Sequence, residues 1–283
     1  MSAMETSALP HRSAPPSTFG EHLRHWRQRR RFSQMDLAHV AEVSTRHLSC
    51  VETGRASPSR EMVLRLVERL DVPLRERNAW LVAAGFAPMY RARPLEDPEM
   101  ASARAAVQRI LECHEPCPAL AMDRHWNLVM YNRLVPMLTA GAAPELLQGP
   151  VNVLRLSLHP QGLAPRIANL RQWREHLFER LRQQIRATGD AVLVALLEEL
   201  KAYPDAFGDT PATGHLALPG EHPGVLMPFQ FHTGHGVLQL VSTTTVFGSP
   251  VDITLQELAL ETFFPADEAT AAVLRGLLAS TPD

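Results

Sequence analysis

The chain has 283 residues, of which 45% are hydrophobic and 20% are charged. This length predicts two domains of roughly 100–200 residues each, and the composition is that of an ordinary folded protein rather than a disordered or fibrous one. No apolar run reaches the roughly 18–20 residues of a membrane span, and residues 1–20 lack the apolar stretch of a signal peptide. We therefore expect a cytoplasmic protein with no membrane partner. The three cysteines are too few for a disulfide framework, which agrees with this compartment.

The charge is distributed unevenly along the chain, although the net charge is only −2. Residues 1–100 hold 15 arginines against 12 acidic residues, whereas residues 101–283 hold 13 basic residues against 18 acidic ones. A uniformly acidic protein would be a poor partner for nucleic acid, but here the first part of the chain is basic. A DNA-binding function is therefore expected in residues 1–100.

The first domain is predicted to be all-helical. Residues 1–16 show no apolar period and are expected to form a disordered arm. Between residues 17 and 90, five short segments with helical apolar spacing are separated by Ser, Thr, Gly and Pro residues that start or stop helices. Residues 91–99 then combine two prolines with mixed charge and no apolar period, and we assign them to a linker.

The second domain, residues 100–283, is predicted to be mixed α/β. Two short apolar runs separated by a polar turn at residues 123–125 indicate a hairpin, and later segments rich in β-branched residues indicate three more strands. The helices are expected at 99–112, 132–140, within 145–202 (the longest at 165–187) and at 266–278; the strands are expected at 119–123, 126–131, 225–232, 237–246 and 257–264.

Residues 33–54 carry the pattern of a helix-turn-helix. Ser33 can cap the first helix and Ser44 the second, Ala38 is small enough for a close helix crossing, and Gly54 supplies a stop. Gln34, at the start of the first helix, is expected to contact a DNA phosphate. We expect the second helix to lie in a major groove.

The exposed side of this second helix provides the candidate DNA-reading residues. Arg46 can read guanine through two hydrogen bonds, and Thr45 can contact a base edge or a thymine methyl. The remaining candidates on the reading face are Ser44, His47, Ser49 and Cys50, and the candidate phosphate-binding residues are Arg31, Arg55 and Arg60. The alternative is a helical hairpin with a solvated basic face.

Arg27 and Glu52 each fall on the inward edge of their predicted helix. A charged residue in that position needs a partner, because an unpaired buried charge is costly. We therefore predict that the two residues form an ion pair.

Two resemblances add to this interpretation. The segment LRHWRQRRRFSQMDLAHVAEVSTRHLSCVETGRASPS resembles the DNA-binding domain of xenobiotic-response-element (XRE) repressors, through its SQ-x-x-LA, V-S and E-x-G positions. The resemblance implies a lambda-repressor-like fold, a phosphate contact for Gln34, and base contacts for Thr45, Arg46 and Cys50. Cys50 departs from the pattern because cysteine is a weak hydrogen-bonding residue.

The second domain is similar to the ligand-binding domain of MmyB-like transcription regulators. The segments ALAMDRHWNLVMYN, NVLRLSLHPQGLAPRIANLRQWREHLFERLRQQ and STTTVFGSPVDITLQELALETFFPADEAT carry this resemblance. It implies a PAS-like fold, a homodimer, and a pocket for a small hydrophobic effector, which is a fatty acid in some members. The two recognition helices of such a dimer are expected to bind an operator with inverted half-sites. No cofactor is implied.

Large apolar side chains and nearby cations are the candidates for this pocket. The aromatic and apolar candidates are Trp126, Val129, Tyr131, Trp173, Phe229, Phe231 and Phe247; the candidates for a carboxylate head group are Arg155, His159 and Arg166. The alternatives are that the apolar candidates are ordinary core residues and that the cationic candidates lie on the surface or bind helix carbonyls.

Other chemistry is less well supported by the sequence. Cys113 and Cys117 are close enough for a metal- or redox-sensing role, but the run between them offers few further ligands. HExxH and G-x-S-x-G motifs are absent from the sequence, so we expect no enzyme. An interaction module such as an antitoxin is a further alternative, and the size of the second domain disfavours it.

Overall fold

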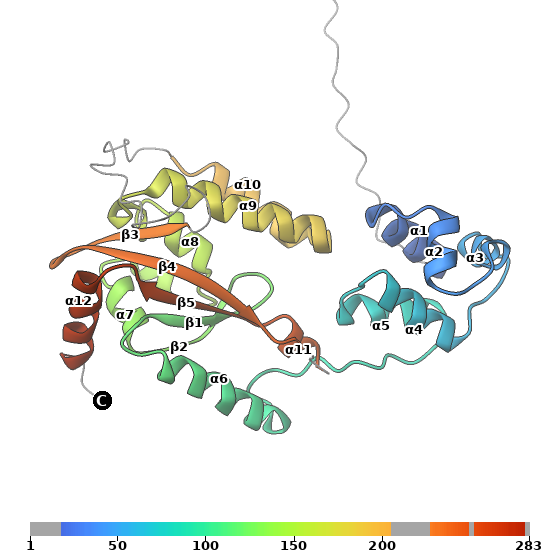
Figure 1. Ribbon diagram of the computed structural model, residues 1–283, viewed down its shortest axis with the longest axis horizontal. Helices are drawn as coiled ribbons and strands as arrows, with labels where there is room; N and C mark the ends of the chain where they lie inside the picture. Colours follow the sequence, from blue (N-terminus) through green and yellow to red (C-terminus); the bar gives the residue numbers. More distant parts are fainter. Residues whose placement is uncertain (1–17, 205–226, 249–251, 281–283) are drawn as a thin grey trace, which may run out of the picture. The chain divides into compact units, whose positions relative to one another are not determined.

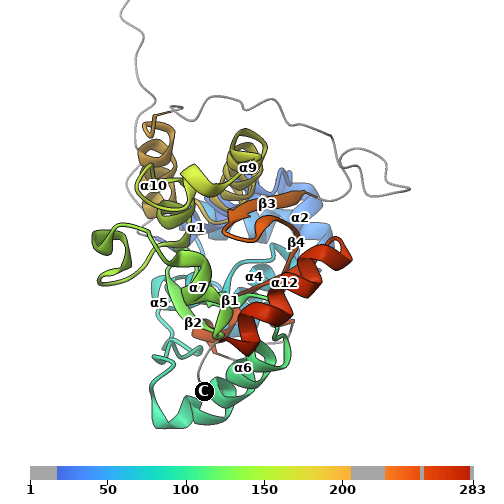
Figure 2. The same ribbon diagram turned by 90° about the vertical axis from the view of Figure 1, so that its left-hand side faces the viewer.

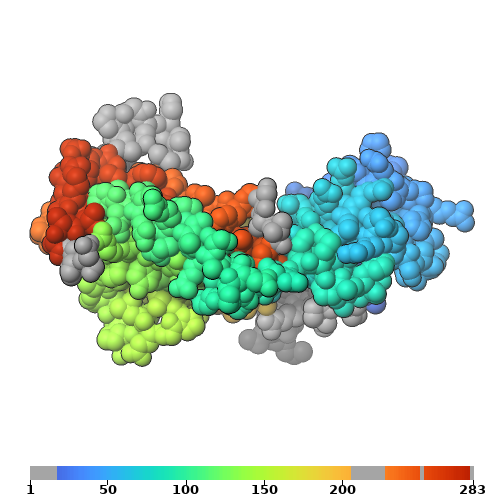
Figure 3. Space-filling view, turned by 90° about the horizontal axis from the view of Figure 1, so that it is seen from below, coloured from blue at the N-terminus to red at the C-terminus, as the bar shows by residue number. Residues whose placement is uncertain are grey.

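A computed structural model describes residues 18–204, 227–248 and 252–280. The predicted arm at residues 1–16 lies outside the described residues. The chain divides into two compact units, Met1–Ala92 and Arg93–Asp283, which Figures 1 and 3 colour from blue to teal and from green to red. Residues 93–99 belong to the second unit although the sequence assigned them to a linker, because Leu95 is buried in that unit's core.

The first unit consists of the five predicted helices. Their bounds are α1 Phe19–Arg29, α2 Gln34–Val40, α3 Thr45–Glu52, α4 Arg60–Arg69 and α5 Leu74–Ala83. Hydroxyl side chains cap four of them, because Thr18, Ser33, Ser44 and Ser59 each accept a backbone N–H from the first turn. The apolar faces meet in one core around the fully buried Trp80.

Gly20 permits the close approach of α1 to the end of α3. A Cβ atom on this residue would lie 2.4 Å from the carbonyl oxygen of Glu52. We expect Gly20→Ala to destabilise the first unit by about 1–3 kcal/mol, even though alanine favours a helix by about 1 kcal/mol. Gly276→Ala in α12 is the matched control, since a Cβ atom on Gly276 would have nothing within 4 Å; it should be neutral or stabilising. Chemical denaturation measures both, and a stabilising Gly20→Ala would contradict the close contact.

The second unit is built on one five-stranded antiparallel sheet with the order β2-β1-β5-β4-β3. The strands are β1 Ala119–Met122, β2 Leu128–Tyr131, β3 Pro228–Thr233, β4 Gly236–Val246 and β5 Ala259–Pro265. The helices are η1 Pro98–Met100, α6 Ala101–Cys113, α7 Leu134–Thr139, η2 Pro144–Leu147, α8 Val153–Leu158, η3 Ala164–Arg166, α9 Leu170–Thr188, α10 Ala191–Lys201, α11 Ile253–Gln256 and α12 Glu268–Ala279. The prediction of a helical domain followed by a PAS-like α/β domain is confirmed.

Side chains alternate between the two faces of the sheet, as expected for strands. In β1, Leu120 and Met122 join the large core that contains α8, α9 and α10, whereas Ala119 and Ala121 pack in the smaller core with α6. α9 and α10 contact each other, and α12 contacts β4 and β5 (Figures 1 and 2). The sheet therefore has a core on each face.

The long helix begins later than the sequence indicates. A helix was predicted from Pro165, but a short η3 turn is followed by Ile167, which forms a β-bridge with Phe231. Asn169 then pairs with β3, because its amide donates to the carbonyl of Pro228 and its oxygen accepts from the backbone N–H of Gln230. These bonds to the edge strand hold residues 167–169 out of the helix, so that α9 begins at Leu170.

Candidate functional site

The first candidate site is the exposed surface of α3. Leu48 and Val51 are buried in the core, whereas Thr45, Arg46 and His47 are exposed in the first turn and Ser49 and Cys50 are half-buried. Ser44 caps the helix, since its hydroxyl accepts from the backbone N–H of His47 at 3.1 Å. This is the N-cap that the sequence predicts for Ser44.

The turn before α3 and the stop after it fix the length of the helix. Glu42 adopts a φ of 54°, a left-handed conformation that non-glycine residues rarely adopt, and Ala38 beside it is buried. After α3, Gly54 has a φ of 73°, and the N–H of Arg55 donates to the carbonyl of Cys50. This left-handed ending is the one expected for a glycine stop.

The predicted ion pair between Arg27 and Glu52 is confirmed. Nε and Nη2 of Arg27 donate to the two carboxylate oxygens of Glu52 at 2.9 and 2.7 Å, and Nη1 donates to the carbonyl of Phe32. The Glu52 side chain is 1% exposed and that of Arg27 is 12% exposed. Arg24 adds a third bond to Glu52 at 3.1 Å. The pair joins α1 to the last residue of α3.

Burial acts to raise the pKa of Glu52, but hydrogen bonds from Arg27 and Arg24 outweigh it, so that the pKa lies below its ordinary value. The nearby amide of Gln34, which the sequence assigned to a phosphate, also acts to lower this pKa. The other phosphate candidates, Arg31, Arg55 and Arg60, are exposed.

The second candidate site is an apolar cavity of about 100 Å³ between the sheet and α7, α8 and α9. Its walls are formed mainly by leucine and aromatic side chains. They include four of the predicted residues, Trp126, Trp173, Phe229 and Phe231. The aromatic rings pack closely, with centroids 4.6 Å apart for Trp173 and Phe229 and 5.5 Å apart for Phe229 and Phe231.

Three predicted apolar residues do not line the cavity. Val129 and Phe247 pack against the smaller core with α6, and Tyr131 is 47% exposed. Alternation along β2 places Val129 on the opposite face from Leu128, so Val129 packs in the smaller core. Leu128 faces the cavity instead.

The three predicted cations bind protein groups rather than lining the cavity. Arg155 forms two 2.7 Å bonds to Glu199, and His159 packs edge-on against Tyr203. Burial and the hydrogen bond to Glu199 raise the pKa of Tyr203 to about 12. Arg166 donates to the carbonyls of Leu138 and Ala140 and lies over the ring of Phe231.

Sequence reasoning missed the charged pair that does line the cavity. Arg180 donates to both oxygens of Glu261 at 3.0 and 2.9 Å, and Thr244 bridges the two side chains. In each segment, the spacing from apolar residues indicates that the charged side chain faces inward. Arg180 lies three residues after Leu177 on the apolar stripe of α9, and Glu261 lies two residues before Phe263 on the apolar face of β5.

Trp126 lies in a strained turn at the edge of the cavity. Its φ of 67° places a bulky residue in the left-handed region, which costs on the order of 1–3 kcal/mol. Asp123 holds the turn by accepting from the backbone N–H groups of His125 and Asn127, and Gln184 of α9 accepts from the indole N–H of Trp126 at 2.8 Å. The turn is thus tied to α9.

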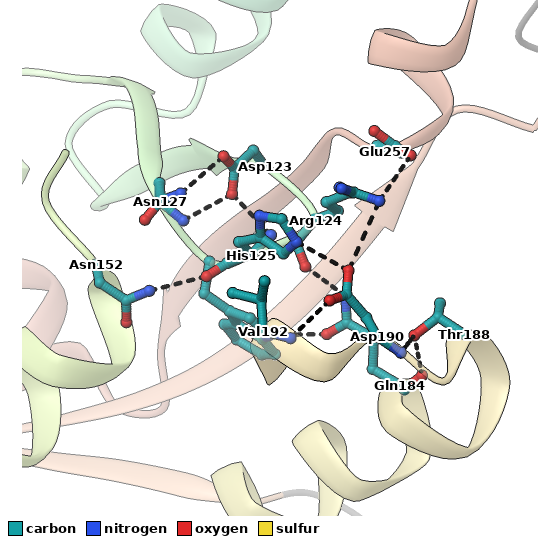
Figure 4. A network of polar contacts seen from close by, with 11 residues as sticks. Asp123, Arg124, His125, Asn127, Asn152, Gln184, Thr188, Asp190, Val192 and Glu257 are labelled. Atoms are coloured by element: carbon teal, nitrogen blue, oxygen red, sulfur yellow. Dashed lines mark hydrogen bonds and ion pairs between the residues drawn. The ribbon is translucent and has the colours of Figure 1, made fainter. Parts of the chain in front are cut away.

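A polar network joins the same turn to two other segments (Figure 4). His125 Nε2 lies 2.9 Å from Asp190, which begins α10, and Arg124 lies between Asp190 and Glu257, which follows α11. Burial acts to raise the pKa of Asp190, but the hydrogen bond from His125 and that from the backbone of Val192 outweigh it and lower the pKa. The network therefore fixes the cavity wall at several points.

Known proteins place these two sites in a family. The family model of the MmyB-like transcription regulator ligand binding domain matches residues 103–277, more than half of the chain, and that of a helix-turn-helix domain matches residues 18–80. The chain belongs to the MmyB-like transcription regulators. In this MmyB-like regulator, the helix-turn-helix match contains α3, and the ligand-binding match contains the whole cavity.

Other comparisons add little to the assignment of this MmyB-like regulator. The sequence matches no curated protein. A solved structure titled "Structure of an RNA-binding Light-Oxygen-Voltage Receptor" is similar at 12% identity with a TM-score of 0.25; the match covers 94% of this chain and 64% of that one. A likeness this weak carries no argument.

Two findings in the described part of the MmyB-like regulator concern the metal- and redox-sensing alternative. It contains no group of three or more His, Cys, Asp or Glu side chains arranged to hold a metal ion. Burial raises the pKa of the Cys117 thiol, which reduces the reactive thiolate at neutral pH. Within the same residues, no helix combines the length and apolar character needed to cross a bilayer.

Proposed function

We propose that this ligand-responsive regulator acts as a homodimer that binds an inverted-repeat operator and changes its DNA affinity when a small hydrophobic effector occupies the cavity. The observation that carries the effector assignment is the apolar cavity walled by Trp126, Trp173, Phe229 and Phe231. Fatty acids are one candidate class, carried over from the MmyB-like resemblance. The coupling between the two sites is expected to be worth about 1–3 kcal/mol.

The DNA-binding part of the proposal rests on the exposed first turn of α3. Two such helices in a dimer would read half-sites separated by about 34–36 Å or a multiple of it. We assign base reading to Arg46 and Thr45 and phosphate binding to Arg31, Arg55 and Arg60, since all five are exposed. Gln34, at the start of α2, is assigned to phosphate binding as well.

Arg46→Ala tests the base-reading assignment. We expect it to cost about 1–3 kcal/mol on the operator and to relax specificity at one base pair, because a bidentate contact to one base is lost. Arg55→Ala is the matched control, which should weaken specific and random DNA alike. Fluorescence anisotropy on operator and scrambled duplexes measures both variants, and an equal loss on the two duplexes for Arg46→Ala would remove its role as a reader.

Native mass spectrometry of the purified protein tests the effector and the dimer together. A dimer mass that carries a bound small apolar molecule, and a change of operator affinity when that molecule is removed, are the expected results. A protein that carries a ligand but binds DNA identically with and without it would contradict the proposed regulation. A monomer on the operator would contradict the proposed inverted repeat.

A further inference from the structure

We propose that the cavity selects an uncharged effector, a small apolar molecule with one hydrogen-bonding group, because the guanidinium at its wall is already neutralised by the protein's own carboxylate. This inference rests on the proposed function and narrows its class of effector, because it favours neutral molecules over the fatty acids carried over from the resemblance. Among the described residues that line the cavity, Arg180 and Glu261 are the charged ones.

The pair forms a closed network. Nη1 and Nη2 of Arg180 each donate to one carboxylate oxygen of Glu261, at 3.0 and 2.9 Å. The hydroxyl of Thr244 accepts from Nη2 of Arg180 at 2.7 Å and donates to Glu261 Oε2 at 2.7 Å. The Arg180 guanidinium also lies 4.8 Å from the ring centroid of Trp126, which lines the same cavity. A guest in the cavity therefore meets a compensated pair.

The protein is built to keep this pair together. The side chains of Arg180 and Glu261 are 21% and 7% exposed, and separating a buried pair leaves a charge without a partner. His176 beside them adds no second cation at neutral pH, because burial and the charge of Arg180 both lower its pKa. The nearby charges are thus one positive and one negative.

Beside this pair, a carboxylate guest pays a free-energy penalty on binding that a neutral guest does not. A carboxylate that bonds to Arg180 must lie close to the carboxylate of Glu261, where the two negative charges repel, or it must displace Glu261 into an apolar wall. An alcohol or amide can bond to Arg180 or Glu261 without either cost. The same apolar body should therefore bind better when its polar group is uncharged.

The size of the cavity sets a second limit. About 100 Å³ is less than the engineered cavity of about 150 Å³ that binds benzene. A single ring or a short chain is the largest guest expected without movement of the walls. Benzyl alcohol with benzoate, and hexanol with hexanoate, are therefore suitable probe pairs, because each pair shares an apolar body and differs in charge.

Isothermal titration of the full-length protein at neutral pH tests the preference. For each pair we expect the wild-type protein to bind the alcohol at least about tenfold more tightly than the acid, a difference readily resolved in Kd. Equal or tighter binding of the acids would overturn the inference. Binding of neither member of either pair would overturn the inference and the proposed effector site together.

Glu261→Gln provides the decisive variant. It retains a hydrogen-bonding side chain of the same size but leaves the charge of Arg180 uncompensated, so the preference should reverse in favour of the acids. Glu199→Gln is the control, since it alters the Arg155 pair away from the cavity lining and should leave the preference unchanged. Circular dichroism confirms folding, and the wild-type comparison decides the matter if Glu261→Gln does not fold.

Measurement of operator binding separates the two proposals. Tight binding of an alcohol with no change in DNA affinity would sustain the ligand preference and contradict the proposed regulation. A change of DNA affinity produced by the acids alone would sustain the proposed regulation and contradict the ligand preference. An unchanged ratio of alcohol to acid affinity in Glu261→Gln would overturn the role of the pair as the selector.

Discussion

Arg27→Ala is expected to destabilise the first unit by about 3–5 kcal/mol, because it leaves the buried carboxylate of Glu52 without its main partner. Arg24→Ala is the matched control: its side chain is 55% exposed and contributes one bond to the same carboxylate, so a loss of about 0–1 kcal/mol is expected. Urea denaturation of both variants, followed by tryptophan fluorescence, gives the comparison. An Arg27→Ala variant as stable as Arg24→Ala would show that the pair contributes nothing beyond a surface contact.

DNA binding should weaken in Arg27→Ala as well, since the pair fixes the last residue of α3 against α1. The loss should appear on operator and random DNA alike, because no base contact is removed. This pattern distinguishes the variant from Arg46→Ala. Anisotropy measured well below the melting temperature of the variant separates the effect from unfolding.

The same pair predicts how stability depends on pH. Glu52 has a lowered pKa in the folded protein, so its contribution is fully present above the unfolded value of about 4.3. The contribution is lost as the pH falls through the folded pKa. As the pH is lowered through this range, the denaturation midpoint should therefore fall more steeply for the wild-type protein than for Glu52→Gln. Parallel curves for the two proteins would contradict this assignment.

Trp173→Ala is expected to destabilise the second unit by about 3–5 kcal/mol, since a large buried aromatic side chain is removed. The variant loses the contact with Phe229 and the indole hydrogen bond to Ser157, and it enlarges the cavity. Indole should then restore part of the loss, by about 2.7 kcal/mol at a concentration one hundred times its Kd. Differential scanning calorimetry with and without indole measures the effect.

Leu193→Ala is the control for this rescue. Leu193 is buried in the same core but does not belong to the cavity lining, so its removal should cost about 2–5 kcal/mol without recovery on addition of indole. Equal rescue of the two variants would mean that indole binds elsewhere. No rescue of Trp173→Ala would mean that the space left by the indole ring is closed by its neighbours.

Local rules were sufficient to predict the first unit. Ser33 and Ser44 are caps that act within a few residues of themselves, and the inward position of Arg27 and Glu52 follows from helical spacing. The surroundings of Gln34 could not be predicted in this way. They depend on how α2 packs against α3, which helical spacing within one segment does not determine.

The cavity required information that the sequence pattern does not contain. Trp173, Phe229 and Phe231 were found because large apolar side chains on predicted elements usually face a core. Arg155 was assigned to a ligand because its neighbours in the sequence are apolar. In the fold α10 contacts α8, and Glu199 of α10 binds Arg155. Arg180 and Glu261 meet because β5 inserts between β1 and β4, and the order of strands is not encoded in any one segment.

The four tryptophans of the chain make each unit separately visible to spectroscopy. Trp26 and Trp80 are buried in the first unit, whereas Trp126 and Trp173 stand in the wall of the cavity. A variant in which the first two are replaced by phenylalanine would emit from the cavity wall alone. Its emission would follow effector entry directly, and the reciprocal variant would report on the DNA-binding unit. The chain thus carries a built-in optical probe for each half of the proposed switch.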